Sequence, residues 1–425
     1  MKERPTVPRV TSEPGFAASR CLFTEPLYSQ LDLVDWDFRD FIPTGKNCSI
    51  HGLHWYPASF PPALVATFLD IVSGPGHVVL DPFCGTGVVP VEAWLRNMRA
   101  TGLDNNRFAI EIGRAKLRLL REGTLSIAED LCSRFCGFRQ SRLADHRHLS
   151  PAELCSRYLM HPDAARWFVP SVLRDVGIAK AWLGSPDPLV AYWSRVLVVS
   201  LSSILHGRLS TVRSYHYTYI VDRSKVGNES RGFTDVEAEF CDKLRAIFVD
   251  AELLRAQVRR AGVSLDQVPE PTLLAGLAQH VSRYVNQEVD LVLTSPPYFG
   301  MNDYTRSQYL SWVVFGWDGY DRDVCSESGS RRARTSPRAL DAYFDDMRSA
   351  FAEMRRVIRK DGWLALVIGS SEARFLGEVD PLSRLRGIVL EQGFDLKWTR
   401  ERRVRFRKIN NTPYRTENLW LLRRA

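Results

Sequence analysis

The chain has 425 residues, 45% of them hydrophobic, so it can build a packed core and is not a disordered polymer. Lys and Arg outnumber Asp and Glu by 57 to 49, and this formal charge of +8 favours a polyanionic partner without requiring one. The N-terminus lacks the apolar run of a signal peptide, and the longest apolar stretch, 196–205, is too short to span a bilayer. We therefore expect a cytoplasmic protein with no membrane partner.

The first part of the chain alternates between helix and strand patterns. Apolar spacing and glycine breaks predict an irregular extension over 1–45, a helix over 61–72, a buried strand over 77–80, a glycine turn at 85–87, a helix over 88–97, a strand over 100–103 and a helix over 108–120. This order is the opening of a doubly wound α/β domain.

The alternation resumes late in the chain. The patterns predict a buried strand over 289–294, a helix over 343–358, a strand over 362–369, a helix over 383–392 and two strand-like runs at 395–406 and 417–422. Residues 120–268 lie between the two parts and are mainly helical in pattern. We expect a Rossmann-like α/β fold with a mostly parallel, seven-stranded sheet. Its halves are 46–119 and 269–425, and 120–268 form an inserted helical subdomain.

A glycine-containing loop follows the first predicted strand, at residues 81–87 (DPFCGTG). Gly85 and Gly87 let the backbone turn tightly and let a ligand approach it. The helix that follows offers free N–H groups to a carboxylate. Asp104, at the end of the next strand, can accept hydrogen bonds from ribose hydroxyls. The dinucleotide pattern GxGxxG is absent, which argues against NAD.

A second motif, residues 295–298 (SPPY), directly follows the strand over 289–294. Carboxyl ends of parallel strands face the ligand crevice. Exocyclic base amines are weak nucleophiles, and hydrogen bonds accepted from their N–H groups make the nitrogen more nucleophilic. Ser295 Oγ and the Pro296 carbonyl can accept those bonds, Pro297 stiffens the turn, and Tyr298 can stack on a base rotated out of the duplex. Since the chain has no Pro-Cys pair and no GxSxG elbow, C5-cytosine methylation and serine hydrolysis are disfavoured.

Three segments together resemble the DNA amino-methyltransferases, and within them the N4-cytosine type: residues 54–62 (HWYPASFPP), the DPFCGTG loop and SPPY. The resemblance covers about 50–118 and 285–425. It implies a class I methyltransferase fold, the cofactor S-adenosylmethionine, and methyl transfer to N4 of cytosine within a specific site in double-stranded DNA. It implies cofactor contacts by Phe60, Asp81, Pro82, Phe83, Cys84, Gly85, Thr86, Gly87, Asp104 and Asn105, and a catalytic role for Ser295, Pro296, Pro297 and Tyr298. Such proteins usually partner a restriction or other defence system.

One departure from the family concerns the stretch before the catalytic strand. The family usually has an acidic residue there, near the adenine ring of the cofactor. Here the stretch reads GLAQ at 276–279, so adenine recognition at this position is left open, with Gln279 as a weak substitute.

Three basic stretches are candidates for DNA contact, because Arg and Lys reach phosphates and guanine edges. The stretches are 208–231, 328–338 and 400–408, and the residues chosen from them are Arg213, Lys225, Arg331, Arg332 and Arg334. The sequence does not decide which stretch reads the target.

The eight cysteines favour free thiols over a metal site. Cys132 and Cys136 lie four residues apart with His146, His148 and Cys155 nearby, but there is no CxxC knuckle and no matching second pair, so we expect no metal.

Three alternative functions remain open. The first is an N6-adenine DNA methyltransferase with the same machinery, since Ser at position 295 favours cytosine only as a tendency. The second is a tRNA guanine-N2 methyltransferase, and the third is a DNA-binding protein that has kept the fold without activity.

Overall fold

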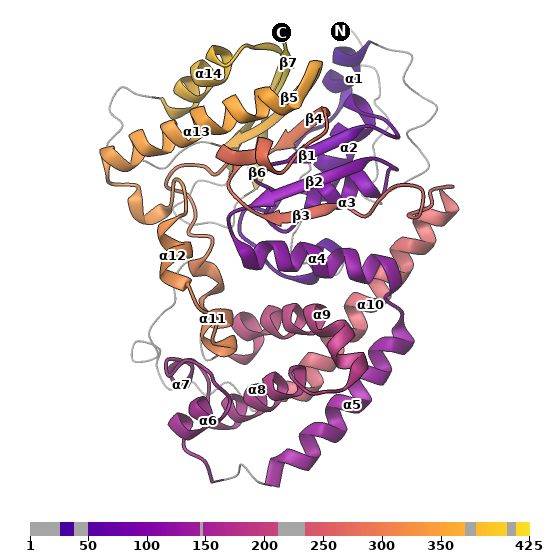
Figure 1. Cartoon of the computed structure of the whole chain (residues 1–425), viewed down its shortest axis with the longest axis vertical. Helices are drawn as coiled ribbons and strands as arrows, with labels where there is room; N and C mark the ends of the chain where they lie inside the picture. The colour runs from indigo at the N-terminus through magenta and orange to yellow at the C-terminus, as the bar shows by residue number, and fades with distance from the viewer. Residues whose placement is uncertain (1–25, 38–49, 145–147, 211–233, 370–379, 406–413) are drawn as a thin grey trace, which may run out of the picture.

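The computed structural model describes residues 26–37, 50–144, 148–210, 234–369, 380–405 and 414–425. Its centre is a seven-stranded sheet in the order β3-β2-β1-β4-β5-β7-β6 (Figure 1). Only β7 runs antiparallel, to both of its neighbours β5 and β6. The strands are β1 Val78–Asp81, β2 Arg99–Asp104, β3 Thr272–Ala275, β4 Val289–Thr294, β5 Ile358–Gly369, β6 Phe394–Arg405 and β7 Tyr414–Arg424. The predicted Rossmann-like fold with a mostly parallel, seven-stranded sheet is confirmed.

Helices cover both faces of the sheet because its central strands are apolar on both sides. Leu80 and Val292 pack with α13 and α14 on one face, whereas Val79 and Leu291 pack with α1, α2 and α3 on the other. These helices are α1 Leu27–Leu33, α2 Pro62–Val72, α3 Val88–Trp94, α13 Pro337–Val357 and α14 Pro381–Glu391. The strands β1 and β4 are direct parallel neighbours, with Leu80 paired to Val292.

The start of α13 and the presence of β3 differ from what the sequence pattern predicts. Helix α13 begins at Pro337, not at 343, because Ser336 caps it by accepting the Ala339 N–H and Pro337 occupies the first turn. Strand β3 has four residues, TLLA, two of them exposed, so it lacks the apolar run by which a buried strand is recognised.

The helical insertion lies below the sheet in Figure 1 and connects β2 and α4 to β3. Helix α4 packs against α9 and α10 of this insertion. The helices are α4 Arg107–Glu122, α5 Leu125–Leu143, α6 Pro151–Arg157, α7 Ala164–Trp167, α8 Pro170–Leu183, α9 Pro188–Ile204 and α10 Val236–Arg260, and α11 Tyr309–Phe315 joins them from the second half.

The described part of the insertion shares its apolar core with α4. A single apolar cluster includes Ile112 and Leu119 of α4 together with Leu197 and Phe240 of the insertion. It also reaches Trp94 of α3. The inserted helical subdomain over 120–268 stays a prediction, and α4 contacts both the sheet, at β2 and β3, and the insertion, at α9 and α10. Among the described helices, none is both long and apolar enough to cross a membrane.

Two glycines in the insertion give a matched test of this packing. A Cβ on Gly177 in α8 would collide with the ring of Tyr158, whereas a Cβ on the exposed Gly137 in α5 would meet nothing within 4 Å. We predict that Gly177→Ala lowers the free energy of unfolding by about 1–3 kcal/mol through overpacking. Gly137→Ala is expected to raise it by about 0.5–1 kcal/mol through helix propensity. Urea denaturation of both variants measures the difference, and equal effects would contradict the described packing.

Candidate active site

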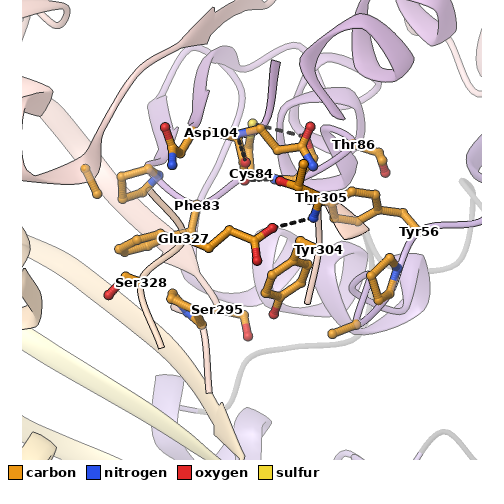
Figure 2. A pocket seen from close by; sticks show the side chains of 18 of the residues that line it. Tyr56, Phe83, Cys84, Thr86, Asp104, Ser295, Tyr304, Thr305, Glu327 and Ser328 are labelled. Atoms are coloured by element: carbon orange, nitrogen blue, oxygen red, sulfur yellow. Dashed lines mark hydrogen bonds between the residues drawn. The ribbon is translucent and has the colours of Figure 1, made fainter. Parts of the chain in front are cut away.

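A cavity of about 120 Å³ opens at the carboxyl ends of β1 to β4. Figure 2 shows that side chains from segments far apart in the sequence converge on it. It is lined by Tyr56, Pro57, Ala58, Ser59, Phe60, Pro82, Phe83, Cys84, Gly85, Thr86, Val88, Asp104, Asn105, Asn106, Gly276, Leu277, Ala278, Gln279, Ser295, Pro297, Tyr304, Thr305, Ser326, Glu327 and Ser328. The predicted cofactor loop and part of the predicted catalytic motif therefore share one cavity.

The two predicted motifs are joined by a buried hydrogen bond. Thr294, the last residue of β4, donates its hydroxyl to Asp81 Oδ1 at 2.6 Å, and the Phe83 N–H donates to the same oxygen at 3.1 Å. Asp81 Oδ2 is buried and accepts no hydrogen bond within the described part of the chain. Burial raises the pKa of Asp81 to about 7. This oxygen is therefore a buried acceptor that lacks a donor.

The loop after Asp81 has a backbone shape that favours glycine. Gly85 and Gly87 have φ values of +50° and +77°, in the left-handed region. Gly87 is the N-cap residue of α3, and no side chain caps that end of the helix. A Cβ on Gly85 would lie 3.3 Å from the ring of Tyr56. The positive end of α3, which no side chain caps, therefore suits an anionic group.

A buried lysine supports this loop through hydrogen bonds to Thr86. Lys116 of α4 is 0% exposed, and its Nζ donates to the Thr86 carbonyl at 2.8 Å and to the Thr86 hydroxyl at 2.9 Å. Burial lowers the pKa of Lys116 to about 7. The sequence pattern does not point to Lys116, because a lysine within an amphipathic helix is usually solvent-exposed.

The end of β2 forms the next wall. Asp104 accepts the Gly85 N–H and the Asn106 N–H, each at 2.8 Å, and burial raises its pKa to about 6. Asn105 donates its amide to the carbonyl and hydroxyl of Ser326, at 3.0 and 2.9 Å. Asp104 lines the cavity with acceptor capacity left on each oxygen, as a ribose-binding carboxylate would.

The donor and acceptor set fits S-adenosylmethionine. The unpaired Asp81 Oδ2 suits an ammonium group, the Asp104 carboxylate suits ribose hydroxyls, and the N-terminus of α3 suits a carboxylate. Of the predicted cofactor residues, Asp81 and Gly87 shape the loop but do not line the cavity, and the other eight line it. Residues 276–279, which follow β3 and lack the acid usual in the family, also line the cavity.

Only part of the SPPY motif borders the cavity. Ser295 and Pro297 line the cavity, whereas Pro296 and Tyr298 do not. The Tyr298 ring lies against the backbone of Gly369, where a Cβ would collide with it. Stacking of a base on Tyr298 therefore stays a prediction, and it requires that the base reach the ring from the cavity.

Two further residues of the cavity carry no recognisable sequence signal. Glu327 accepts the Thr305 N–H with Oε1, and its Oε2 is buried without a partner within the described ranges (Figure 2). Burial raises the pKa of Glu327 to about 7. Tyr304 stacks on Tyr56 with ring centroids 5.8 Å apart. Both residues come from loops, and only the tertiary structure brings them to the cofactor loop.

The predicted DNA contacts are partly described. Arg331, Arg332 and Arg334 lie in and just after the short helix η7, Arg331–Ala333, which follows the cavity residue Ser328 in the chain. Arg332 also has a structural contact, since it donates to the Val324 carbonyl at 2.9 Å. Arg213 and Lys225 lie outside the described residues. No group of three metal-ligating side chains suited to an ion occurs in the part of the chain that is described.

Comparisons with known proteins point to one family. Residues 25–115 match the family model N6_N4_Mtase, described as DNA methylase. The Type II methyltransferase M.MjaII of Methanocaldococcus jannaschii is 31% identical over 87 residues, which are 20% of this chain and 16% of that relative. The matched family segment contains the 54–62 motif and the DPFCGTG loop.

Solved structures give only weak superpositions. The rRNA methyltransferase aviRa of Streptomyces viridochromogenes is 13% identical with a TM-score of 0.34, covering 90% of this chain and 92% of its own. TrmN from Thermus thermophilus is 11% identical with a TM-score of 0.31, covering 87% of this chain and 50% of its own. The fold is established by the sheet order itself.

Two carboxylates, Asp104 in the cavity wall and Asp81 buried at the start of the DPFCGTG loop, predict a pH-dependent affinity for S-adenosylhomocysteine. Ligand ammonium and hydroxyl groups favour ionised Asp81 and Asp104, so the affinity should fall, by about tenfold, as pH decreases from about 8 to about 5.5 through their raised pKa values. Isothermal titration calorimetry measures this. Asp81→Asn should remove the part of this pH dependence that lies near pH 7. Because Lys116 titrates in the same range, the variant distinguishes the contribution of Asp81 from that of Lys116. The exposed Asp266→Asn is the control, and an unchanged pH profile in Asp81→Asn would refute the assignment.

The buried lysine gives a second prediction. Lys116→Met keeps an unbranched apolar side chain but removes both hydrogen bonds to Thr86. We expect the affinity for S-adenosylhomocysteine to fall about tenfold because the loop loses its support. The free energy of unfolding should not fall by more than about 1 kcal/mol, since the cost of burying the lysine is removed together with its hydrogen bonds. Titration calorimetry and urea denaturation measure the two effects, and unchanged affinity would show that Lys116 does not support the loop.

Proposed function

We propose that this member of the DNA amino-methyltransferase family transfers a methyl group from S-adenosylmethionine to an exocyclic amine of a base in double-stranded DNA, and that the amine is N4 of cytosine. The observation that supports it best is the Thr294–Asp81 hydrogen bond of 2.6 Å. Because of this bond, the SPPY motif and the DPFCGTG loop border the same cavity. A cofactor held by the loop would therefore have its reactive end beside Ser295.

The proposed chemistry is direct transfer to an amine. When bound, S-adenosylmethionine supplies a methyl group that its sulfonium already activates. The chain then has to hold the amine in line and accept its N–H hydrogen bonds. We assign these acceptors to Ser295 Oγ and the Pro296 carbonyl. Pro297 stiffens the turn, and Tyr343 holds it further by donating to the Pro297 carbonyl at 2.9 Å.

The target base has to leave the duplex to reach this cavity. We propose that Tyr298 or the neighbouring loop stacks on the base, and that Arg331 and Arg334 contact the DNA backbone from helix η7 and its end. Arg213 and Lys225 are proposed as further contacts. A cognate restriction endonuclease or another defence protein is the proposed biological partner.

N6-adenine methylation is the second candidate. The same acceptors would serve an adenine amine, and the family model that matches residues 25–115 covers both kinds of enzyme by its name. Ser295, in place of the Asp that is commoner in adenine enzymes, supports cytosine.

The product distinguishes these functions. Incubating the protein with unmethylated DNA and labelled S-adenosylmethionine, followed by digestion to nucleosides, should yield N4-methylcytosine. If N6-methyladenine were found instead, the target base would be adenine and not cytosine. Label in tRNA alone would overturn the assignment to DNA.

Two variants test the assigned site. Ser295→Ala and Pro297→Ala should lower kcat by about 10²-fold or more, because each removes an acceptor or the rigidity of the turn. Their affinity for S-adenosylhomocysteine should change less than about threefold, since neither contacts the loop backbone. Ser349→Ala, on the exposed side of α13, is the matched control. Full activity in the Pro297→Ala variant would remove the motif from the mechanism.

A further inference from the structure

The hydroxyl of Ser295 poses a chemical problem for the proposed function. A serine hydroxyl can donate or accept a hydrogen bond, whereas an Asp carboxylate at that position only accepts. The target amine presents N–H donors and needs an acceptor. If the Ser295 proton pointed into the cavity, it would meet the amine with the wrong polarity. Something in the chain has to direct that proton away from the base.

The hydrogen bonds of the Tyr298 hydroxyl direct the Ser295 proton away from the base. Ser295 Oγ lies 3.0 Å from the Tyr298 hydroxyl. That hydroxyl also lies 3.3 Å from the Val367 carbonyl and 3.3 Å from Glu417 Oε1. The carbonyl and the carboxylate can only accept, so the single Tyr298 proton points to them. The Tyr298 oxygen is then left as an acceptor, and Ser295 is its donor. The lone pairs of Ser295 Oγ consequently face the cavity.

Glu417 is held in place by a buried ion pair. Arg402 of β6 is 4% exposed and donates to Glu417 Oε2 from Nε at 2.8 Å and from Nη2 at 2.5 Å. The two residues face each other in the β6–β7 register. With Oε2 engaged by the guanidinium, Oε1 is the oxygen that reaches Tyr298. Burial also raises the pKa of Tyr298 well above its usual value, so the phenol keeps its proton.

We propose that Glu417, fixed by Arg402, is a positioning residue that sets the direction of the hydrogen bonds from Ser295 through Tyr298, so that Ser295 Oγ presents only acceptor lone pairs to the target amine. This inference rests on the proposed function. It assigns to the C-terminal hairpin a role in the methyl transfer, although neither Glu417 nor Arg402 lines the cavity.

A double-mutant cycle tests the proposal in the full-length chain. Tyr298→Phe keeps the ring against Gly369 but removes the acceptor for the Ser295 proton. It should lower the single-turnover rate of DNA methylation about tenfold with the KM for DNA within about twofold. Glu417→Gln should lower the rate about fivefold, because an amide can donate to Tyr298 where the carboxylate cannot. In the Tyr298→Phe background, Glu417→Gln should cost less than about twofold.

Ser295→Asp offers a second arm that does not depend on changes at position 417. A carboxylate needs no direction from Tyr298, so Tyr298→Phe should cost less than about twofold in the Ser295→Asp background. Thermal unfolding and titration with S-adenosylhomocysteine confirm that each variant folds and binds.

The outcomes separate the two hypotheses. Additive losses from Tyr298→Phe and Glu417→Gln, with the wild-type chain active on DNA, would overturn the inference alone and show that Glu417 acts only on the structure. A wild-type chain that binds S-adenosylhomocysteine but methylates no DNA would overturn the proposed function, and the inference with it.

Discussion

The site depends on the parallel pairing of β1 with β4. This pairing brings Asp81 and Thr294 together across 213 residues of chain. The hydrogen bond between them is fully buried, so removing either partner would leave an unsatisfied polar group in the core. Because one strand leads into the cofactor loop and the other into SPPY, a displacement of either strand would move the two motifs apart. The arrangement of the cavity follows from this contact.

The predicted cofactor loop borders the cavity and is supported by a buried lysine. Its glycines keep the backbone accessible, while Lys116 satisfies the Thr86 carbonyl from below. A buried lysine is costly unless its donors are used. Lys116 lies on α4, the helix shared between the sheet and the insertion. The helix that supports the loop therefore also packs against α9 and α10 of the insertion.

The C-terminal hairpin adds a second support, on the side of the catalytic motif. Its antiparallel strand β7 lies between β5 and β6, which sets Glu417 opposite Arg402 and close to Tyr298. A serine in the SPPY motif has a hydroxyl whose polarity is set by its neighbours, whereas an aspartate is an acceptor by itself. In the proposal, Arg402 holds Glu417 so that its carboxylate accepts the Tyr298 proton. The Tyr298 oxygen is then the acceptor for the Ser295 proton.

The sequence alone determined the α/β class, most element positions and both motifs, because apolar periodicity and glycine or proline turns are local signals. It also showed that the stretch 276–279 lacks the acid usual in the family, whereas its place in the cavity wall comes from the structure. It did not reveal β3, Lys116, Glu327 or the Arg402–Glu417 pair. Strand β3 is short and half exposed, so its pattern is weak. The charged residues have no local signature, since a Lys or Glu in a helix or loop reads as solvent-exposed until the fold buries it. Only the tertiary structure decides which charges are buried, and burial is what turns them into parts of a site.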